Sequence, residues 1–162
     1  DWGHRFDMMQ QHTAQHLLSA LALNERAWVT LSFHLSEESA FVVFDQSKIT
    51  ASDLVWLEAQ ANSRVRDALN VQPRLASEAD LTGGGIRCRK LPDVRAGGLR
   101  LVDIDGVDLN TCGGTHVHNT AALQMIRVLK VEPHRGASRV YFEAGGRVLG
   151  RARRDVPGDG GR

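Results

Sequence analysis

The stretch that decides the fold is residues 111–117, Thr-Cys-Gly-Gly-Thr-His-Val, read together with residues 9–18, Met-Gln-Gln-His-Thr-Ala-Gln-His-Leu-Leu. The two stretches supply three imidazoles and one thiol, those of His12, His16, Cys112 and His116. Zinc binds nitrogen and sulfur ligands in a tetrahedron. His12 and His16 are four residues apart, which places them on one face of a helix. The pattern predicts one zinc site that joins distant parts of the chain.

Each half of this pattern has a plainer reading when it is taken alone. Two histidines four residues apart usually mark a polar helix face, and Cys-Gly-Gly-Thr-His is usually a turn. Gly113 and Gly114 disfavour a helix and let the backbone turn sharply, so Cys112 and His116 can point at one ion. Matching ligand chemistry in one short chain favours the shared site over the two separate readings.

The sequences of the two motifs resemble those of the alanyl-tRNA editing family. This family comprises the editing domain of alanyl-tRNA synthetase and free-standing AlaX-type proteins, with a more distant version in threonyl-tRNA synthetase. The shared domain is the threonyl/alanyl-tRNA synthetase second additional domain. The resemblance runs from residue 1 to about residue 148, and the stretches that carry it are residues 5–18, 105–108, 112–117, Thr120 and 135–145.

The resemblance implies a Zn²⁺ cofactor and hydrolysis of the ester that joins an amino acid to the tRNA 3′ end. The implied substrate and partner is mischarged alanine tRNA carrying serine, with glycine as a second substrate. A hydrophobic pocket that selects alanine rejects the added hydroxyl of serine only weakly, so a separate site is needed to hydrolyse the mischarged product. Four protein ligands would fill a tetrahedral zinc, so the residues leave open whether zinc is catalytic or only positions the substrate.

Three further side chains are expected in the pocket. Thr13, next to His12, is the candidate hydrogen-bond partner of the serine hydroxyl. The alternative is that Thr13 packs against its own helix or bonds a backbone carbonyl. Gln10 and Gln11 are candidates for holding a water or the ribose. A glutamate after the first histidine, the base of H-E-x-x-H metalloproteases, is absent from this motif.

Composition limits how the chain can bind RNA. It has 162 residues, 42% of them hydrophobic, and a formal net charge of +1, which suits one domain with a real core. This charge excludes a polybasic nucleic-acid binder, so tRNA contact must depend on local patches. The residues expected to touch tRNA are Arg87, Arg89, Lys90, Arg135 and Arg139.

The predicted fold class is α+β, with a largely antiparallel sheet, two long helices on one face, and zinc between the first helix and the Cys-Gly-Gly-Thr-His loop. Helices are expected over residues 6–23 and 52–69, the second opened by a capping box at residues 50–53. A glycine-rich loop is expected at residues 81–85. The expected strands cover residues 28–34, 40–45, 71–77, 99–104, 122–131 and 139–144.

The domain organisation is expected to be a tRNA-editing domain over residues 1–150 and a basic, glycine-rich, disordered tail over residues 151–162. Longer family members carry an N-terminal β domain with a Gly-Gly-Gly-Gln stretch, which is absent from these residues. The chain is therefore either the short form or a piece from which that domain, or a fused synthetase, has been removed.

Cys88 has no expected partner, which favours a reducing, cytoplasmic compartment. No run of residues has the length and apolarity of a membrane span. We expect a monomer. Two alternative functions stay open: a non-catalytic zinc-containing module that binds tRNA or a protein, and an editor of seryl-threonine tRNA.

Overall fold

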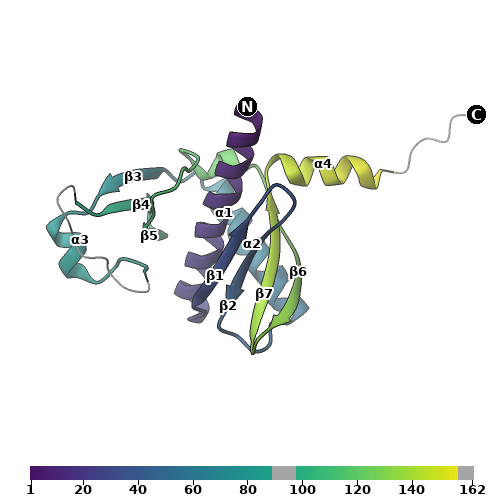
Figure 1. Cartoon of the computed structure of the whole chain (residues 1–162), viewed down its shortest axis with the longest axis horizontal. Coiled ribbons are helices and arrows are strands. Elements are labelled where there is room, and N and C mark those ends of the chain that lie inside the picture. Colours follow the sequence, from purple (N-terminus) through teal and green to yellow (C-terminus); the bar gives the residue numbers. More distant parts are fainter. Residues whose placement is uncertain (89–97, 157–162) are drawn as a thin grey trace, which may run out of the picture.

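The computed structural model describes residues 1–88 and 98–156. Its elements, in chain order, are α1 (Trp2–Arg26), β1 (Thr30–Leu35), β2 (Ala40–Phe44), α2 (Ala51–Arg66), β3 (Val71–Leu75), α3 (Glu78–Gly83), β4 (Arg100–Ile104), β5 (Asp108–Thr111), the 3₁₀ helix η1 (Thr120–Leu123), β6 (Ile126–His134), β7 (Ala137–Ala144) and α4 (Gly146–Asp155). Figure 1 shows how these elements are arranged.

The strands form two antiparallel sheets. One has four strands in the order β1-β2-β7-β6, and the other has three in the order β3-β4-β5. The α+β class and the antiparallel pairing are confirmed. The expectation of one sheet is wrong, because β3 and β4 pair with each other through Val71 and Ile104 and form a small core of their own.

Helices α1 and α2 pack against one face of the four-stranded sheet. Residues of β7 alternate, so that Val140, Phe142 and Ala144 enter the core while Arg139 and Tyr141 face outward. The buried side chains of both helices belong to the same hydrophobic cluster. This is the layered packing expected when a half-buried antiparallel sheet is covered by helices.

Helix α1 is longer at both ends than the periodicity predicts. Asp1 caps its start by accepting a hydrogen bond from the Gly3 N–H, and Ala27 ends it in the left-handed conformation. Helix α2 begins as expected, because Thr50 and Asp53 form the predicted capping box.

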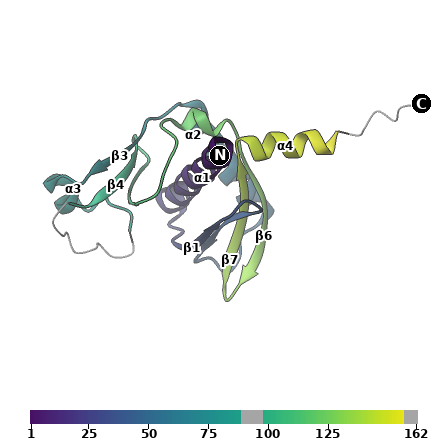
Figure 2. The same cartoon turned by 45° about the horizontal axis from the view of Figure 1, so that its top comes forward.

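The three-stranded sheet is tied to α1 and to the segment that carries the Cys-Gly-Gly-Thr-His motif. The Asn24 side chain donates to the Val107 carbonyl at 2.9 Å, and the Val71 N–H donates to the His118 carbonyl at 2.9 Å. Figure 2 shows this sheet beside α1, on the side away from the four-stranded sheet. Strand β5 leads directly into residues 112–117, so this packing brings them over α1.

Two local expectations are wrong in the middle of the chain. Residues 78–83 form the short helix α3, where a loop was expected from residue 81, because Ser77 and Asp80 make a second capping box and Gly84 closes the helix in the left-handed conformation. Residues 120–123 form η1 in place of the first part of the strand expected over residues 122–131. Asn119 caps that turn by accepting from the Ala121 N–H.

The expectation of a disordered tail from residue 151 is also corrected. Helix α4 runs to Asp155, and Arg151 forms an ion pair with Glu143. Arg147 fixes the start of α4 by pairing with both oxygens of Asp7, at 2.9 and 2.8 Å. Residues 157–162 of the expected tail lie outside the described residues. No helix in the described ranges has the length and hydropathy needed to cross a bilayer.

Candidate metal centre

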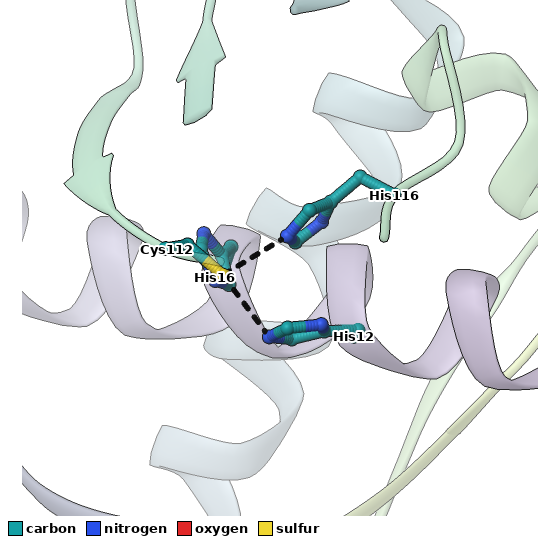
Figure 3. Close-up of side chains that lie close together, drawn as sticks. All are labelled: His12, His16, Cys112 and His116. Carbon is teal, nitrogen blue, oxygen red and sulfur yellow. Dashed lines mark hydrogen bonds between the residues drawn. The ribbon is translucent and has the colours of Figure 1, made fainter. Parts of the chain in front are cut away.

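The four predicted ligands meet at one point between α1 and the loop that follows β5 (Figure 3). One potential ligand atom from each of them lies within 4.8 Å of all the others. Consecutive turns of α1 present His12 and His16, and the loop presents Cys112 and His116. His16 and His116 are buried, whereas His12 and Cys112 are half-buried.

The spacing of these atoms fits a tetrahedral zinc ion. The Cys112 Sγ lies 3.7 Å from His12 Nε2 and 3.5 Å from His116 Nε2. Zinc–sulfur and zinc–nitrogen bonds of ordinary length place these ligand atoms about 3.6 Å apart in a tetrahedron. A thiolate with three neutral imidazoles is also a ligand set that zinc accepts.

Both ends of the loop motif favour the protonation states that a metal requires. Burial raises the pKa of the Cys112 thiol, but hydrogen bonds with His116, His12 and His16 outweigh it and lower the pKa to about 3. Burial lowers the pKa of His116 to about 4, so its ring is neutral at pH 7. Metal ligation needs a deprotonated thiol and a neutral imidazole.

Gly114 is needed because the His12 ring lies against its backbone. A Cβ added there would lie 2.3 Å from His12 Cε1 and 2.7 Å from His12 Nδ1. Neither Gly113 nor Gly114 adopts a positive φ. The two glycines are therefore not required by a turn that needs a positive φ. Gly114 leaves room for the His12 ring, whereas Gly113 has open space around it.

Thr13 is fully buried and its hydroxyl is bonded on the protein side of the centre. The Thr13 Oγ1 lies 3.0 Å from His116 Nδ1 and accepts a hydrogen bond from the Val117 N–H at 3.1 Å. With Nδ1 held in this way, His116 presents Nε2 to the centre. This placement corrects the expectation of a contact with the serine hydroxyl and gives Thr13 a positioning role.

Asp108, held by Arg87, lies behind His16 at ion-pair distance, and His16 Nδ1 makes no hydrogen bond to any described residue. The Asp108 Oδ2 lies 3.6 Å from His16 Nδ1, and Arg87 donates to both carboxylate oxygens of Asp108 at 2.8 and 2.7 Å. Burial raises the pKa of Asp108, but Arg87 and His16 outweigh it and lower the pKa below its usual value. A carboxylate behind a metal-binding histidine orients the ring and raises its basicity.

The sequence carried a signal for Asp108 that periodicity could have revealed. In an extended strand, residues two apart share a face, so Asp108 and Asn110 lie on the same side as Cys112. Arg100 gave no comparable signal. Its Nη1 donates to the carbonyls of Cys112 at 2.6 Å and Gly114 at 3.0 Å, which fixes the loop.

Gln10 and Gln11 are buried hydrogen-bond anchors of α1, which corrects their expected contact with water or ribose. Gln11 Nε2 donates to the Ala144 carbonyl at 3.0 Å, and the Ala144 N–H donates to Gln11 Oε1 at 2.9 Å. Gln10 Nε2 donates to the Ala122 carbonyl at 2.8 Å. Gly145, at φ +60°, is needed beside it because a Cβ there would meet the Gln10 amide at 2.2 Å.

A cavity of about 820 Å³ opens onto three of the four ligands, His12, His16 and Cys112. Its other walls come from α1, from β1 with residue 29, and from residues 86–88 and 110–111. Gln15 lines this cavity and is only 2% exposed, yet its Oε1 has no hydrogen-bond partner among the described residues. A buried acceptor without a partner is rare in proteins and points to a ligand.

Polar groups continue along the wall beside Gln15. The Gln15 Nε2 donates to the Ser19 hydroxyl at 3.0 Å, and the Thr30 hydroxyl donates to the same oxygen at 2.8 Å. Sequence reasoning missed all three residues. Gln15 lies inside the first motif, but nothing in the pattern distinguishes a cavity-lining glutamine from the anchors Gln10 and Gln11.

The basic residues expected to touch tRNA lie in different environments. Arg87 is bonded to Asp108 and lines the cavity wall, and its expected contact with tRNA stays a prediction. Arg135 is exposed at the tip of the β6–β7 hairpin. Arg139 lies on the outer face of the sheet, over the Phe41 ring at 4.4 Å. Arg89 and Lys90 lie outside the described residues.

Comparison with known proteins agrees with this site. A family model described as the threonyl and alanyl tRNA synthetase second additional domain matches residues 99–141, which include Cys112 and His116. The alanyl-tRNA editing protein Aarsd1-B of Xenopus laevis is 39% identical over 150 residues, which are 92% of this chain. The chain belongs to the alanyl-tRNA editing family.

Other relatives support this membership. The alanyl-tRNA editing protein Aarsd1 of Rattus norvegicus is 41% identical over 92% of this chain. The alanine–tRNA ligase of Methanococcus aeolicus is 31% identical over 90% of the chain. The chain spans 36% of the length of the Xenopus and rat proteins and 16% of the ligase. The likeness therefore concerns one region of these longer family members.

Proposed function

We propose that this chain is a zinc-dependent aminoacyl-tRNA deacylase that removes serine, and secondarily glycine, from mischarged alanine tRNA. The observation that carries the proposal is the large cavity that opens onto His12, His16 and Cys112. A centre with a purely structural role needs no such access. The names of the relatives, which include alanyl-tRNA editing proteins and alanine–tRNA ligases, support the choice of substrate.

The chain's own residues would hold zinc at a fixed position. His12, His16, Cys112 and His116 are the ligands, with Thr13 behind His116 and Asp108 behind His16. A bound zinc ion supplies positive charge that can orient or polarise the ester carbonyl. An aminoacyl ester is already reactive, so the main task of the cavity is to position the ester and a water.

Selection for serine requires a hydrogen-bond partner for its hydroxyl. Gln15 lines the cavity, and its buried Oε1 has no hydrogen-bond partner among the described residues, so it becomes the acceptor if the amide side chain turns toward the substrate. The Gln15 Nε2 donates to the Ser19 hydroxyl. Alanine offers no donor to this oxygen and leaves it unpaired when it fills the same space. A site of this kind can discriminate against the residue that lacks the hydroxyl.

The deciding experiment compares deacylation of seryl-, glycyl- and alanyl-tRNA, all on alanine tRNA, by the zinc-loaded wild-type chain. We expect serine to be released rapidly, glycine more slowly, and alanine to be spared. His116→Ala, checked for folding by circular dichroism, is the control, since it removes one ligand. If a folded, zinc-loaded wild type releases none of the three, the deacylase proposal is wrong and the non-catalytic module is favoured.

Replacing Gln15 with leucine tests the selectivity argument separately. We expect the ratio of kcat/KM for seryl over alanyl ester to fall by about 2- to 10-fold, the value of one ordinary hydrogen bond. Gln72→Leu, at an exposed position of β3, is the matched control. An unchanged ratio in the Gln15 variant would remove this residue from the account and leave the deacylase itself untouched.

A further inference from the structure

The cavity is larger than an amino acid requires. Its volume of about 820 Å³ lies in the range of about 300–1,000 Å³ that proteins use for drug-sized ligands. Serine alone is much smaller than such a ligand. The cavity therefore has room for the nucleoside to which the ester is attached.

The two ends of the cavity differ in chemistry. Strand β1 lies along α1 so that Thr30 contacts Ser19 at one end and Phe33 lies beside His12 at the other. Ser19 and His12 are seven residues apart on α1, a separation of about 10 Å along the helix. The wall around Ser19 is polar, through Thr30 and Gln15, and it becomes apolar beyond Ser19 at Leu23, Val29 and Leu31. The His12 end presents an aromatic ring.

Phe33 is placed as an open stacking surface. The residue is 50% exposed, although phenylalanine is usually buried, and it lines the cavity. Its ring lies 6.0 Å from the His12 ring with an interplanar angle of 29°, so the two rings are nearly parallel. A flat base entering from the cavity could contact the exposed part of this ring.

The position of Phe33 in the sheet explains its exposure. Strand β1 is an edge strand, and Phe33 pairs with Val42, whose side chain lies in the core between sheet and helices. Phe33 therefore projects from the helix-covered face at the point where the sheet ends. The register shifts between Thr30 and Ser32, and such bulges redirect side chains next to binding sites.

We propose that Phe33 is the stacking platform for the terminal adenine of the aminoacyl-tRNA. This inference rests on the proposed function and adds a direction to it: the base lies at the His12 end and the amino acid points toward Gln15. Aromatic side chains bind the faces of unpaired bases in this way in proteins that recognise single strands. The ester then lies between the two ends, next to the ligands that line the cavity.

The test measures binding of two non-hydrolysable probes by calorimetry. One is 3′-deoxy-3′-(L-seryl)aminoadenosine, and the other is the same seryl amide on a ribose that lacks the base. We expect the zinc-loaded wild type to bind the adenosine probe on the order of 10-fold more tightly, the usual effect of one stacked base. Phe33→Ala should reduce this ratio to nearly one, and Phe33→Trp should keep it.

Two controls separate stacking from other effects. Phe33→Leu keeps apolar contact but removes the aromatic face, so it should lose most of the ratio. Trp2→Ala removes another exposed aromatic that does not line this cavity, so it should behave as wild type. An unchanged ratio in Phe33→Ala, a full ratio in Phe33→Leu, or failure of the wild type to bind either probe would overturn the assignment.

The same samples distinguish this inference from the proposed function. If the wild type deacylates seryl-tRNA but Phe33→Ala keeps the probe ratio, the stacking role fails and the editing function stands. If the wild type does not deacylate but binds the adenosine probe through Phe33, the stacking role of Phe33 stands and the deacylase proposal fails.

Discussion

At the scale of single residues, the centre depends on groups that are not ligands. Thr13 and Asp108 lie behind two of the histidines, and Gly114 makes room for a third. None of these groups shares the His and Cys chemistry that identifies the ligands in the sequence. Their effect should therefore appear in the affinity for metal before it appears in the chemistry.

Gly114→Ala provides the sharpest test of this packing, with Gly113→Ala as its matched control. A methyl group at position 114 meets the His12 ring at 2.3 Å, whereas at position 113 it meets nothing within 4 Å. Overpacking of this kind costs about 1–3 kcal/mol, so zinc affinity should fall about 5- to 100-fold in the first variant only. Competition with a chromophoric chelator measures it. Equal affinity in both variants would contradict the contact.

Thr13→Val should act through His116 and leave substrate choice unchanged. Valine keeps the shape of threonine but removes the oxygen that bonds His116 Nδ1 and the Val117 N–H. We expect zinc affinity to fall about 10- to 100-fold, as for other groups that support a metal ligand. Once zinc is restored, the ratio of seryl to alanyl hydrolysis should equal that of wild type. A lower ratio at full zinc occupancy would return Thr13 to the substrate pocket.

At the scale of elements, α1 supplies two ligands, one wall of the cavity and the main connections to the sheet. Its buried amides hold it in place: Gln11 bonds both backbone groups of Ala144 at the end of β7. Any shift of α1 would move His12 and His16 together relative to the loop. The position of the helix is therefore part of the geometry of the centre.

Gln11→Ala tests this connection. The change leaves the N–H and carbonyl of Ala144 buried without their partner, which costs about 1–3 kcal/mol for each unsatisfied group. We expect the free energy of unfolding to fall by about 2–4 kcal/mol, measured by urea denaturation with zinc present. Gln72→Ala, at an exposed position of β3, should change this free energy by less than about 0.5 kcal/mol. A change of that small size in the Gln11 variant would contradict the anchoring role.

Elements with strong local signals could be predicted from the sequence. Helix α2 has its capping box, and β1, β2 and β7 have apolar patterns bounded by turn residues. The division into two sheets could not be predicted, because strand pairing depends on long-range contacts such as Val71 with Ile104. The start of α4 also rests on a distant contact, that of Arg147 with Asp7.

The same difference between local sequence signals and long-range contacts applies to the site. His12, His16, Cys112 and His116 carry chemistry that their spacing reveals, and the structure brings them together. The amides of Gln10, Gln11 and Gln15 look alike in sequence. Only the fold determines that two of them bond backbone while Gln15 faces the cavity.

At the scale of the whole molecule, the centre joins parts of the chain that are distant in sequence. Cys112 is 100 residues from His12, and the loop that carries it extends from the three-stranded sheet, whose core is small. A metal bound here would fasten that sheet to α1 and to the main core. Metal occupancy should therefore contribute to the stability of the folded chain.

Removal of zinc should lower the melting temperature of the chain. Free zinc at about 1,000 times its dissociation constant stabilises a protein by about 4 kcal/mol, which corresponds to about 10 °C in a domain of this size. Differential scanning calorimetry of chelated and reconstituted protein measures the difference. His116→Ala serves as the control and should show a much smaller response. Identical melting of the wild type in both states would argue against a zinc centre.

The proposed function requires that this four-residue centre support ester hydrolysis on tRNA. The most direct test measures the rate of serine release from seryl alanine tRNA as zinc is returned to chelated, still folded protein. We expect a negligible rate without metal and a linear recovery that levels off at one zinc per chain. A full rate in the metal-free protein, or no rate at one zinc per chain, would contradict it.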